Sequence, residues 1–288
     1  MAKDADKAMQ DAQKQLAEMQ KQMEQQLAHL PKEQRDLVMQ SFAAQQASLT
    51  NTYAGLVAGA EDGDDDGEGN EAYEALHKEF VARNKPSPEH AKYLPIGALL
   101  IGTWDEPYET LALMLSDKDD VMGALENGWG IRDRKEGLKM MEALMDGRHA
   151  KKFKAVHDAM RSGKKDKVDP DDAEDYEGAV EAVLEILELP KSYIEKCETL
   201  YAWDLERVGY LARLFVHVGF ITEAEAWEWM KKAGAKIKEN FKDWESYIVS
   251  ILIGRAFAMG LAEEPFAVAY DLLTDNKNFL DAHPIKNL

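Results

Sequence analysis

The chain has 288 residues, of which 45% are hydrophobic, and its 54 acidic and 35 basic residues give a formal net charge of −19. The apolar content is enough for a sizeable core and excludes wholesale disorder, whereas the charge argues against a general nucleic-acid binder or a binder of anionic membranes, because both need basic surface. The single cysteine, Cys197, excludes an intrachain disulfide and a multi-cysteine zinc site.

Residues 1–59 are predicted to form a helical hairpin, a coiled-coil-like arm. An apolar residue recurs every seven positions from Met9 to Leu30, Pro31 then interrupts the helix, and a second, weaker apolar stripe runs from Val38 to Leu56. Two readings stay open for this arm. It either packs on the main domain or serves as a dimerisation or partner-docking arm.

Residues 60–71 predict an acidic linker, because glycine and like charge both oppose compaction. The segment imitates the start of a calcium loop at Asp62, Asp64 and Asp66, but Tyr73 stands where the closing bidentate glutamate is required. We therefore expect a solvated linker without calcium, followed by a short helix over 71–84.

The remainder, 72–288, is predicted to be one all-helical domain, and the fold class is all-α. Helix N-termini are indicated near Ser116, Asp133, Thr222 and Asp243, with Thr222 and Glu225 matching a capping box. Helix ends are expected near four glycines, and residues 162–177 are expected to form an exposed polar loop. The glycines are Gly128, Gly147, Gly219 and Gly234. The longest apolar run, 93–104, is too short to span a membrane, which needs ~20 residues.

Several segments carry a distinctive pattern of tryptophan, arginine and glycine. They include Tyr201-Ala-Trp-Asp-Leu-Glu-Arg, Gly219-Phe-Ile-Thr-Glu-Ala-Glu-Ala-Trp-Glu-Trp, Asp243-Trp-Glu-Ser-Tyr, Leu252-Ile-Gly-Arg and Asn127-Gly-Trp-Gly-Ile-Arg. Over roughly residues 95–265 the chain resembles the bacterial domain-of-unknown-function 1266 family. The resemblance implies an all-helical fold and supplies no activity.

Charged residues inside apolar helical segments are the candidate ligand-binding residues: Asp204, Arg207, Arg213 and Arg255. Asp204 and Arg207 are three residues apart on one helix and can pair. Arg255 lies in another apolar helix, where a charge is costly unless it is paired, so we predict that it is buried against a carboxylate, with Asp204 as its partner. The cluster is either a structural ion pair or a pocket that clamps an anion.

The other chemistry-bearing residues give weak signals. Trp227 is predicted to face the core with Met230, and Trp129 and Trp229 are candidate partner-binding residues, with core packing as the alternative. The seven histidines show no helical zinc spacing, and no nucleotide-binding or hydrolase motif is present. We therefore predict no catalytic residue, no metal and no cofactor.

These observations favour a non-catalytic cytoplasmic protein that binds a basic protein partner, and neither nucleic acid nor membrane. Its acidic surface and an aromatic patch would form the interface, as in an immunity protein or inhibitor of a basic toxin. The alternative is an enzyme or secreted effector with an anionic ligand held by Asp204, Arg207 and Arg255. A homodimer through the N-terminal helices also stays open.

Overall fold

A computed structural model describes residues 67–288, which are helices joined by turns, with no strand in this part of the chain. The all-α prediction is therefore confirmed for the described residues. The predicted arm at 1–59 and most of the predicted linker at 60–71, with its calcium-like loop, lie outside them.

The helices are, in chain order, α3 (Gly67–Arg83), α4 (Pro88–Ala91), α5 (Ala98–Gly102), α6 (Lys118–Trp129), α7 (Arg134–Met145), α8 (Arg148–Arg161), α9 (Pro170–Leu187), α10 (Ser192–Glu195), α11 (Ala202–Val218), α12 (Glu223–Asn240), α13 (Trp244–Met259), α14 (Glu263–Leu273) and α15 (Lys277–Ala282). Short 3-10 turns lie at Lys165–Lys167 and Ile285–Asn287.

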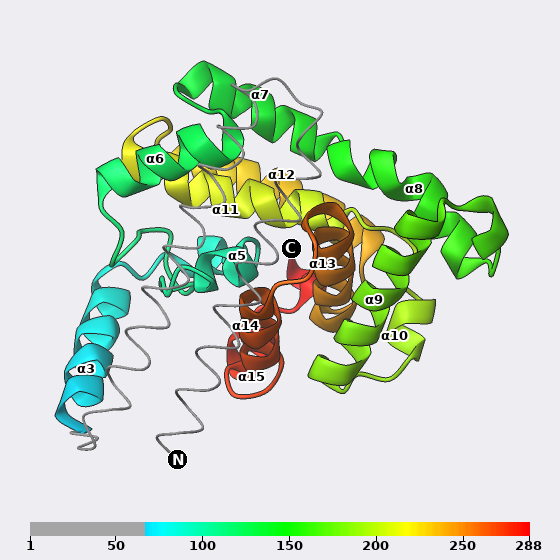
Figure 1. The fold of residues 1–288 in the computed structure, drawn as a ribbon. Coiled ribbons are helices and arrows are strands. Elements are labelled where there is room, and N and C mark those ends of the chain that lie inside the picture. The colour runs from blue at the N-terminus through cyan, green and yellow to red at the C-terminus, as the bar shows by residue number, and fades with distance from the viewer. Residues whose placement is uncertain (1–66) are drawn as a thin grey trace, which may run out of the picture. The chain divides into compact units, whose positions relative to one another are not determined.

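The centre of the fold is α11, which is buried around its whole circumference from Ala202 to Phe215. Such a helix belongs to the interior of a protein, with other helices on every side. It packs against α5, α6, α7, α8, α12 and α13. Figure 1 shows α11 and α12 running side by side through the middle of the molecule, with α6 and α7 on one side and α5 and α13 on the other.

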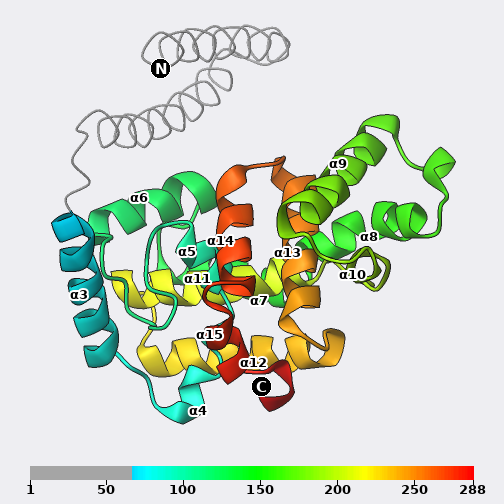
Figure 2. The ribbon, with the colours of Figure 1, turned by 90° about the horizontal axis from the view of Figure 1, so that it is seen from below.

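A second layer of packing joins α13 to α9 and α14, and α9 also contacts α8 and α14. Seen from below, α8, α9 and α10 gather at one end of the described unit, with α3 at the opposite end (Figure 2).

Two charged residues of α11 form hydrogen bonds with the segments that precede and follow α5. Arg213, fully buried, donates from its guanidinium to the carbonyl oxygens of Leu94 and Ile96 at 2.6 and 2.7 Å, and also to those of Tyr108, Thr110 and Gly209. Glu206, also fully buried, accepts from the amides of Gly97 and Leu100 and from the Tyr247 hydroxyl.

These bonds require the backbone of Ile96 and Gly97 to lie directly against α11. Gly97 adopts a left-handed conformation with φ 88°, and a Cβ on Gly209 would stand 2.2 Å from the Ile96 carbonyl oxygen. Only glycine fits at either position, because glycine alone lacks the Cβ that would separate the two backbones.

Most predicted helix starts are confirmed. The side chains of Asp117, Asp133 and Asp243 accept backbone N–H groups at their N-caps, and Thr222 with Glu225 forms a complete capping box. Gly147 and Gly219 lie at helix boundaries as predicted.

Gly128 lies near the end of α6 as predicted, and Gly130 takes the left-handed terminal conformation. Two local predictions are wrong. Gly234 lies inside α12, where its missing side chain makes room for the Tyr93 ring. The polar loop predicted at 162–177 ends early, because Asp169 caps α9 and Pro170 occupies its first turn, where acidic residues complement the helix dipole.

We expect Gly209→Ala to lower the free energy of unfolding by about 3 kcal/mol or more, since the new methyl group meets rigid backbone rather than a movable side chain. The matched control is Gly178→Ala in α9, where a Cβ meets nothing within 4 Å. This control should raise stability by up to about 1 kcal/mol, because alanine favours helix over glycine. Urea unfolding of both variants tests the contact, and equal effects would contradict it.

Candidate functional site

Asp204 is the hub of the predicted charged cluster. Its carboxylate has no exposed surface and accepts from the backbone N–H groups of His149, at 3.0 Å, and Ala150, at 2.8 Å. These amides belong to the first turn of α8, so Asp204 caps this helix from a distant part of the sequence. The same carboxylate also lies 2.8 Å from Arg207 Nη2, which confirms that Asp204 and Arg207 pair.

Arg207 is 6% exposed, and its guanidinium Cζ lies 4.3 Å from the centre of the Trp203 ring and 5.8 Å from that of Trp129. Its Nε donates to the Trp203 carbonyl oxygen at 2.9 Å. Burial lowers the pKa of Arg207 to about 10, with the nearby Asp204 carboxylate opposing that shift, so the guanidinium stays charged at neutral pH.

His149 is the residue that sequence reasoning did not assign to the cluster. Its Nδ1 lies 2.9 Å from Asp204 Oδ1 and 2.6 Å from Arg207 Nη2. A ring nitrogen either donates or accepts, so only one of these two contacts is a hydrogen bond at a time. No sequence signal marks this position, because His149 and Asp204 are brought together only by the packing of α8 on α11.

The predicted pairing of Arg255 with Asp204 is wrong. Arg255 is half-buried and donates to the Gly260 carbonyl oxygen at 3.0 Å, close to the end of its own helix. Burial lowers the pKa of its guanidinium, and the nearest carboxylate that opposes this shift belongs to Glu264. The helix that carries Arg255 is apolar, but its last turn reaches the surface, so the charge needs no buried partner.

Arg213 is buried but forms no pocket, since backbone carbonyl groups surround its guanidinium. Glu206 accompanies it inside the protein and was missed in the sequence. Burial raises the pKa of Glu206, and hydrogen bonds from Gly97, Leu100 and Tyr247 oppose that rise. A carboxyl residue in the middle of an otherwise apolar helical segment is the signal that could have identified it.

The two candidate partner-binding tryptophans are half-buried. Trp129 stacks on Tyr210 with ring centres 6.1 Å apart, and Trp229 lies beneath the Lys232 ammonium group at 4.8 Å. Trp227 and Met230 are buried in the core as predicted. A role of Trp129 and Trp229 in partner binding stays a prediction.

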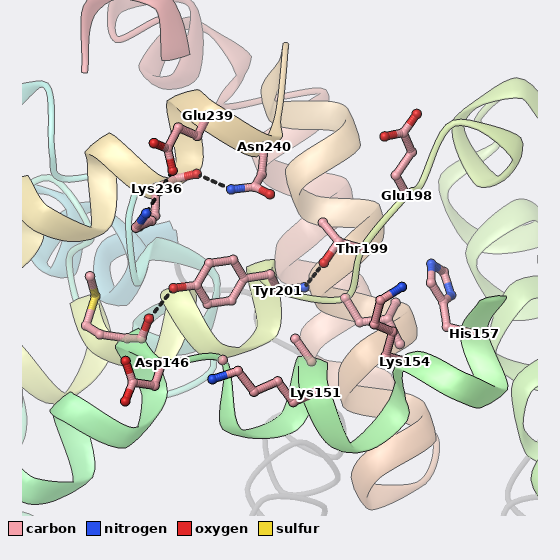
Figure 3. Close-up of a pocket in the computed structure, with 14 residues that line it drawn as sticks. Asp146, Lys151, Lys154, His157, Glu198, Thr199, Tyr201, Lys236, Glu239 and Asn240 are labelled. Atoms are coloured by element: carbon pink, nitrogen blue, oxygen red, sulfur yellow. Dashed lines mark hydrogen bonds and ion pairs between the residues drawn. The ribbon is translucent and has the colours of Figure 1, made fainter.

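A cleft of about 560 Å³ opens beside the start of α8, between that helix and the end of α12 (Figure 3). Its charged lining residues are Asp146, Lys151, Lys154, Glu198, Lys236 and Glu239. Lys236 pairs with Glu239 at 2.9 Å, and Lys154 pairs with Asp158 just outside the lining. Positive and negative charges are thus balanced around this cleft, which favours no particular ligand charge.

The nucleophile and acid–base candidates of this region make hydrogen bonds to other groups of the protein. The hydroxyl of Tyr201 donates to the Met145 carbonyl oxygen, and burial raises the pKa of Tyr201 to about 12. Both ring nitrogens of His157 are engaged, Nε2 with the Cys197 carbonyl oxygen at 2.9 Å and Nδ1 with the Tyr176 hydroxyl at 2.8 Å. Burial raises the pKa of the Cys197 thiol to about 11, so it stays protonated at neutral pH.

Within residues 67–288, no group of three or more histidine, cysteine, aspartate or glutamate side chains could hold a metal ion. In the same range, no helix is long and apolar enough to cross a membrane.

A family model described as "Protein of unknown function (DUF1266)" matches residues 124–284. The match confirms the family resemblance and includes α8, α9, α11 and α13, with the cluster around Asp204. The matched range begins after the segment around α5 to which Glu206 and Arg213 are hydrogen-bonded. Comparisons with curated proteins and with solved structures gave no significant match.

We expect Asp204→Asn to lower the free energy of unfolding by about 3–5 kcal/mol, because it leaves the buried Arg207 without its counter-charge. Arg255→Gln, which removes a charge from a half-exposed position, should cost less than about 1 kcal/mol. Chemical denaturation measures both. If both variants lost the same free energy of unfolding, the result would support the pairing of Arg255 with Asp204 after all.

The pH dependence of stability should carry a contribution from His157. Burial lowers the pKa of this imidazole to about 4 from its ordinary value of 6.5, so the unfolded chain binds the proton first. Stability from this group is complete above pH 6.5 and is lost as the pH falls toward 4, by about 2 kcal/mol between pH 7 and 5. Urea unfolding across this range should show a shallower fall for His157→Gln than for the wild type, and parallel curves would refute the contribution.

Proposed function

We propose that this protein, which belongs to the DUF1266 family, is a non-catalytic module that binds a basic protein partner through an acidic surface. Inhibition of a basic toxin, as by an immunity protein, is the form of this function that we favour, with a cytoplasmic location. The charged residues that bear on this function fall into two groups, those buried inside the fold and those exposed on its surface.

The inner group supports a non-catalytic role. Asp204, Glu206 and Arg213 have no exposed surface, and the polar atoms of each are engaged with backbone or side-chain groups of the protein itself. An enzyme that binds an anion needs cationic groups that face a substrate. Arg207 instead is buried, with its guanidinium near two tryptophan rings and paired with Asp204.

The outer group is the acidic face of α9, which is the observation that carries the proposal. The helix contains no lysine or arginine. Its exposed carboxylates run along its whole length: Asp171, Asp172, Glu174, Asp175, Glu177, Glu181 and Glu185. Of these seven carboxylates, only that of Glu177 forms an ion pair with another described residue, Lys165, at 2.6 Å.

Such a face is unfavourable for the free protein. Like charges four residues apart on a helix destabilise it by ~0.2–0.5 kcal/mol per pair. A basic partner would remove this repulsion on binding, and the field of the acidic surface would accelerate its approach.

The test is affinity capture from the native host, with the bound proteins quantified by mass spectrometry. A variant with Asp175→Asn, Glu181→Gln and Glu185→Gln should retain several-fold less of a basic partner than the wild type. The control carries the same change of charge on exposed residues of other helices: Glu126→Gln, Glu142→Gln and Glu228→Gln. This control should capture the partner as the wild type does.

The association rate of the captured partner should fall steeply with added salt while its dissociation rate changes little, because steering acts on the approach of the two proteins. Equal capture by both triple variants, or an association rate independent of salt, would contradict the proposal.

A further inference from the structure

A groove of about 780 Å³ lies between α9, the end of α8 and α10. It is lined by Met160, Arg161, Tyr176, Glu177, Val180, Glu181, Leu184, Glu185, Lys191, Ile194 and Glu195. The groove is at the end of the described unit where α8, α9 and α10 gather (Figure 2).

The α9 wall of the groove has two parallel rows of side chains. Tyr176, Val180 and Leu184 form an apolar row at a spacing of four residues. Glu177, Glu181 and Glu185 form an acidic row at the same spacing, one position further along the helix. Residues four apart lie on one face of a helix, so the two rows run side by side for about two turns, ~12 Å.

The opposite wall is different in character. Met160 and Ile194 continue the apolar floor, and Arg161 donates to the Glu195 carbonyl oxygen at 2.9 Å. Together with Lys191, Arg161 makes this wall partly basic. The groove is thus apolar in the middle, acidic along α9 and mixed along α8 and α10, and this asymmetry would fix the orientation of whatever binds there.

We propose that this groove docks an amphipathic helix of a basic protein partner. The inference rests on the proposed function and names the surface and the partner element that the function would use. Apolar side chains of the partner helix would fill the space above Val180 and Leu184. Its lysines or arginines would lie along the row of Glu177, Glu181 and Glu185.

Two observations select a helix as the occupant. Rows of side chains spaced by four residues form ridges on a helix, and the ridges of a second helix pack into the grooves between them. The described residues contain no strand, so a partner strand would find no sheet edge to extend. Charge complementarity selects a basic helix, because the acidic row lies beside the apolar floor and two of its three glutamates have no ion pair among the described residues.

The test uses the full chain and a synthetic helical peptide of leucine and lysine whose leucines form one face. A second peptide of the same composition, with its leucines spread around the helix, is the control ligand. Titration calorimetry should detect binding of the amphipathic peptide and at least about tenfold weaker binding of the control peptide. Equal binding of the two peptides, or no binding of either, would overturn the proposal.

Variants on α9 test whether the groove itself is the binding site. Glu181→Lys reverses a charge on the acidic row and should weaken binding about tenfold. Glu174→Lys makes the same change on an exposed position of the same helix outside the groove, and should alter binding less than twofold. If both substitutions weakened peptide binding equally, the peptide would be responding only to net charge, and the groove would not be its binding site.

An apolar pair of variants separates this proposal from the proposed function. Leu184→Ser removes part of the groove floor, and Ile186→Ser removes an exposed apolar side chain that does not line it. Circular dichroism verifies that each variant folds, and Val180→Ser, another apolar lining residue, replaces Leu184→Ser if that variant does not fold. Weakening by Leu184→Ser alone supports the groove. If a native partner were captured through the α9 carboxylates and still bound both serine variants as it binds the wild type, that result would support the proposed function and refute the groove as the docking site.

Discussion

The fold depends on the burial of acidic and basic side chains in its central helix. Asp204, Glu206, Arg207 and Arg213 all belong to α11 and are almost fully removed from solvent. An unpaired buried charge costs several kcal/mol, so each of them must find partners inside the protein. The segment around α5 supplies carbonyl groups to Arg213 and amides to Glu206, and the first turn of α8 supplies amides to Asp204. Elements far apart in the sequence are thereby fixed to α11 at particular atoms, which apolar packing alone would not achieve.

This arrangement also explains why two kinds of charge behave differently in one chain. A carboxylate in α11 is stabilised by directional donors, so it contributes to the geometry of the fold. Of the exposed carboxylates on α9, only Glu177 forms an ion pair with another described residue, Lys165, and the cationic residues Arg161 and Lys191 stand on the other wall of the groove. A ligand that competed for the donors of a buried carboxylate would destabilise the fold. A cation that approaches the surface carboxylates instead lowers their electrostatic energy, so a surface with such charges is suited to binding rather than to holding the fold together.

The sequence was sufficient for local features and insufficient for tertiary ones. Asp133, Thr222 and Asp243 were identifiable as helix caps, because capping depends on neighbours within one turn. The contact of Asp204 with Arg207 was predictable for the same reason, as both lie on one helix. The partners of Arg255 and Arg213 were not predictable, because a buried arginine can be satisfied by backbone carbonyl groups that leave no trace in residue type. The start of α9 was misread because acidic residues near a helix N-terminus resemble a solvated loop in composition, although the helix dipole favours them there.

The cleft beside Tyr201 and the groove of α9 differ in how charged and apolar side chains are distributed around them. The cleft beside Tyr201 is lined by as many lysines as carboxylates, and Lys236 already pairs with Glu239. A charged ligand would have to displace these internal pairs, so its gain would be small. Along the groove of α9, acidic side chains share one wall and apolar side chains share the floor. A ligand with the complementary order of groups would relieve repulsion between carboxylates and bury apolar surface in the same contact. Segregation of charge, more than the depth of either hollow, is therefore the reason to look for the partner at α9.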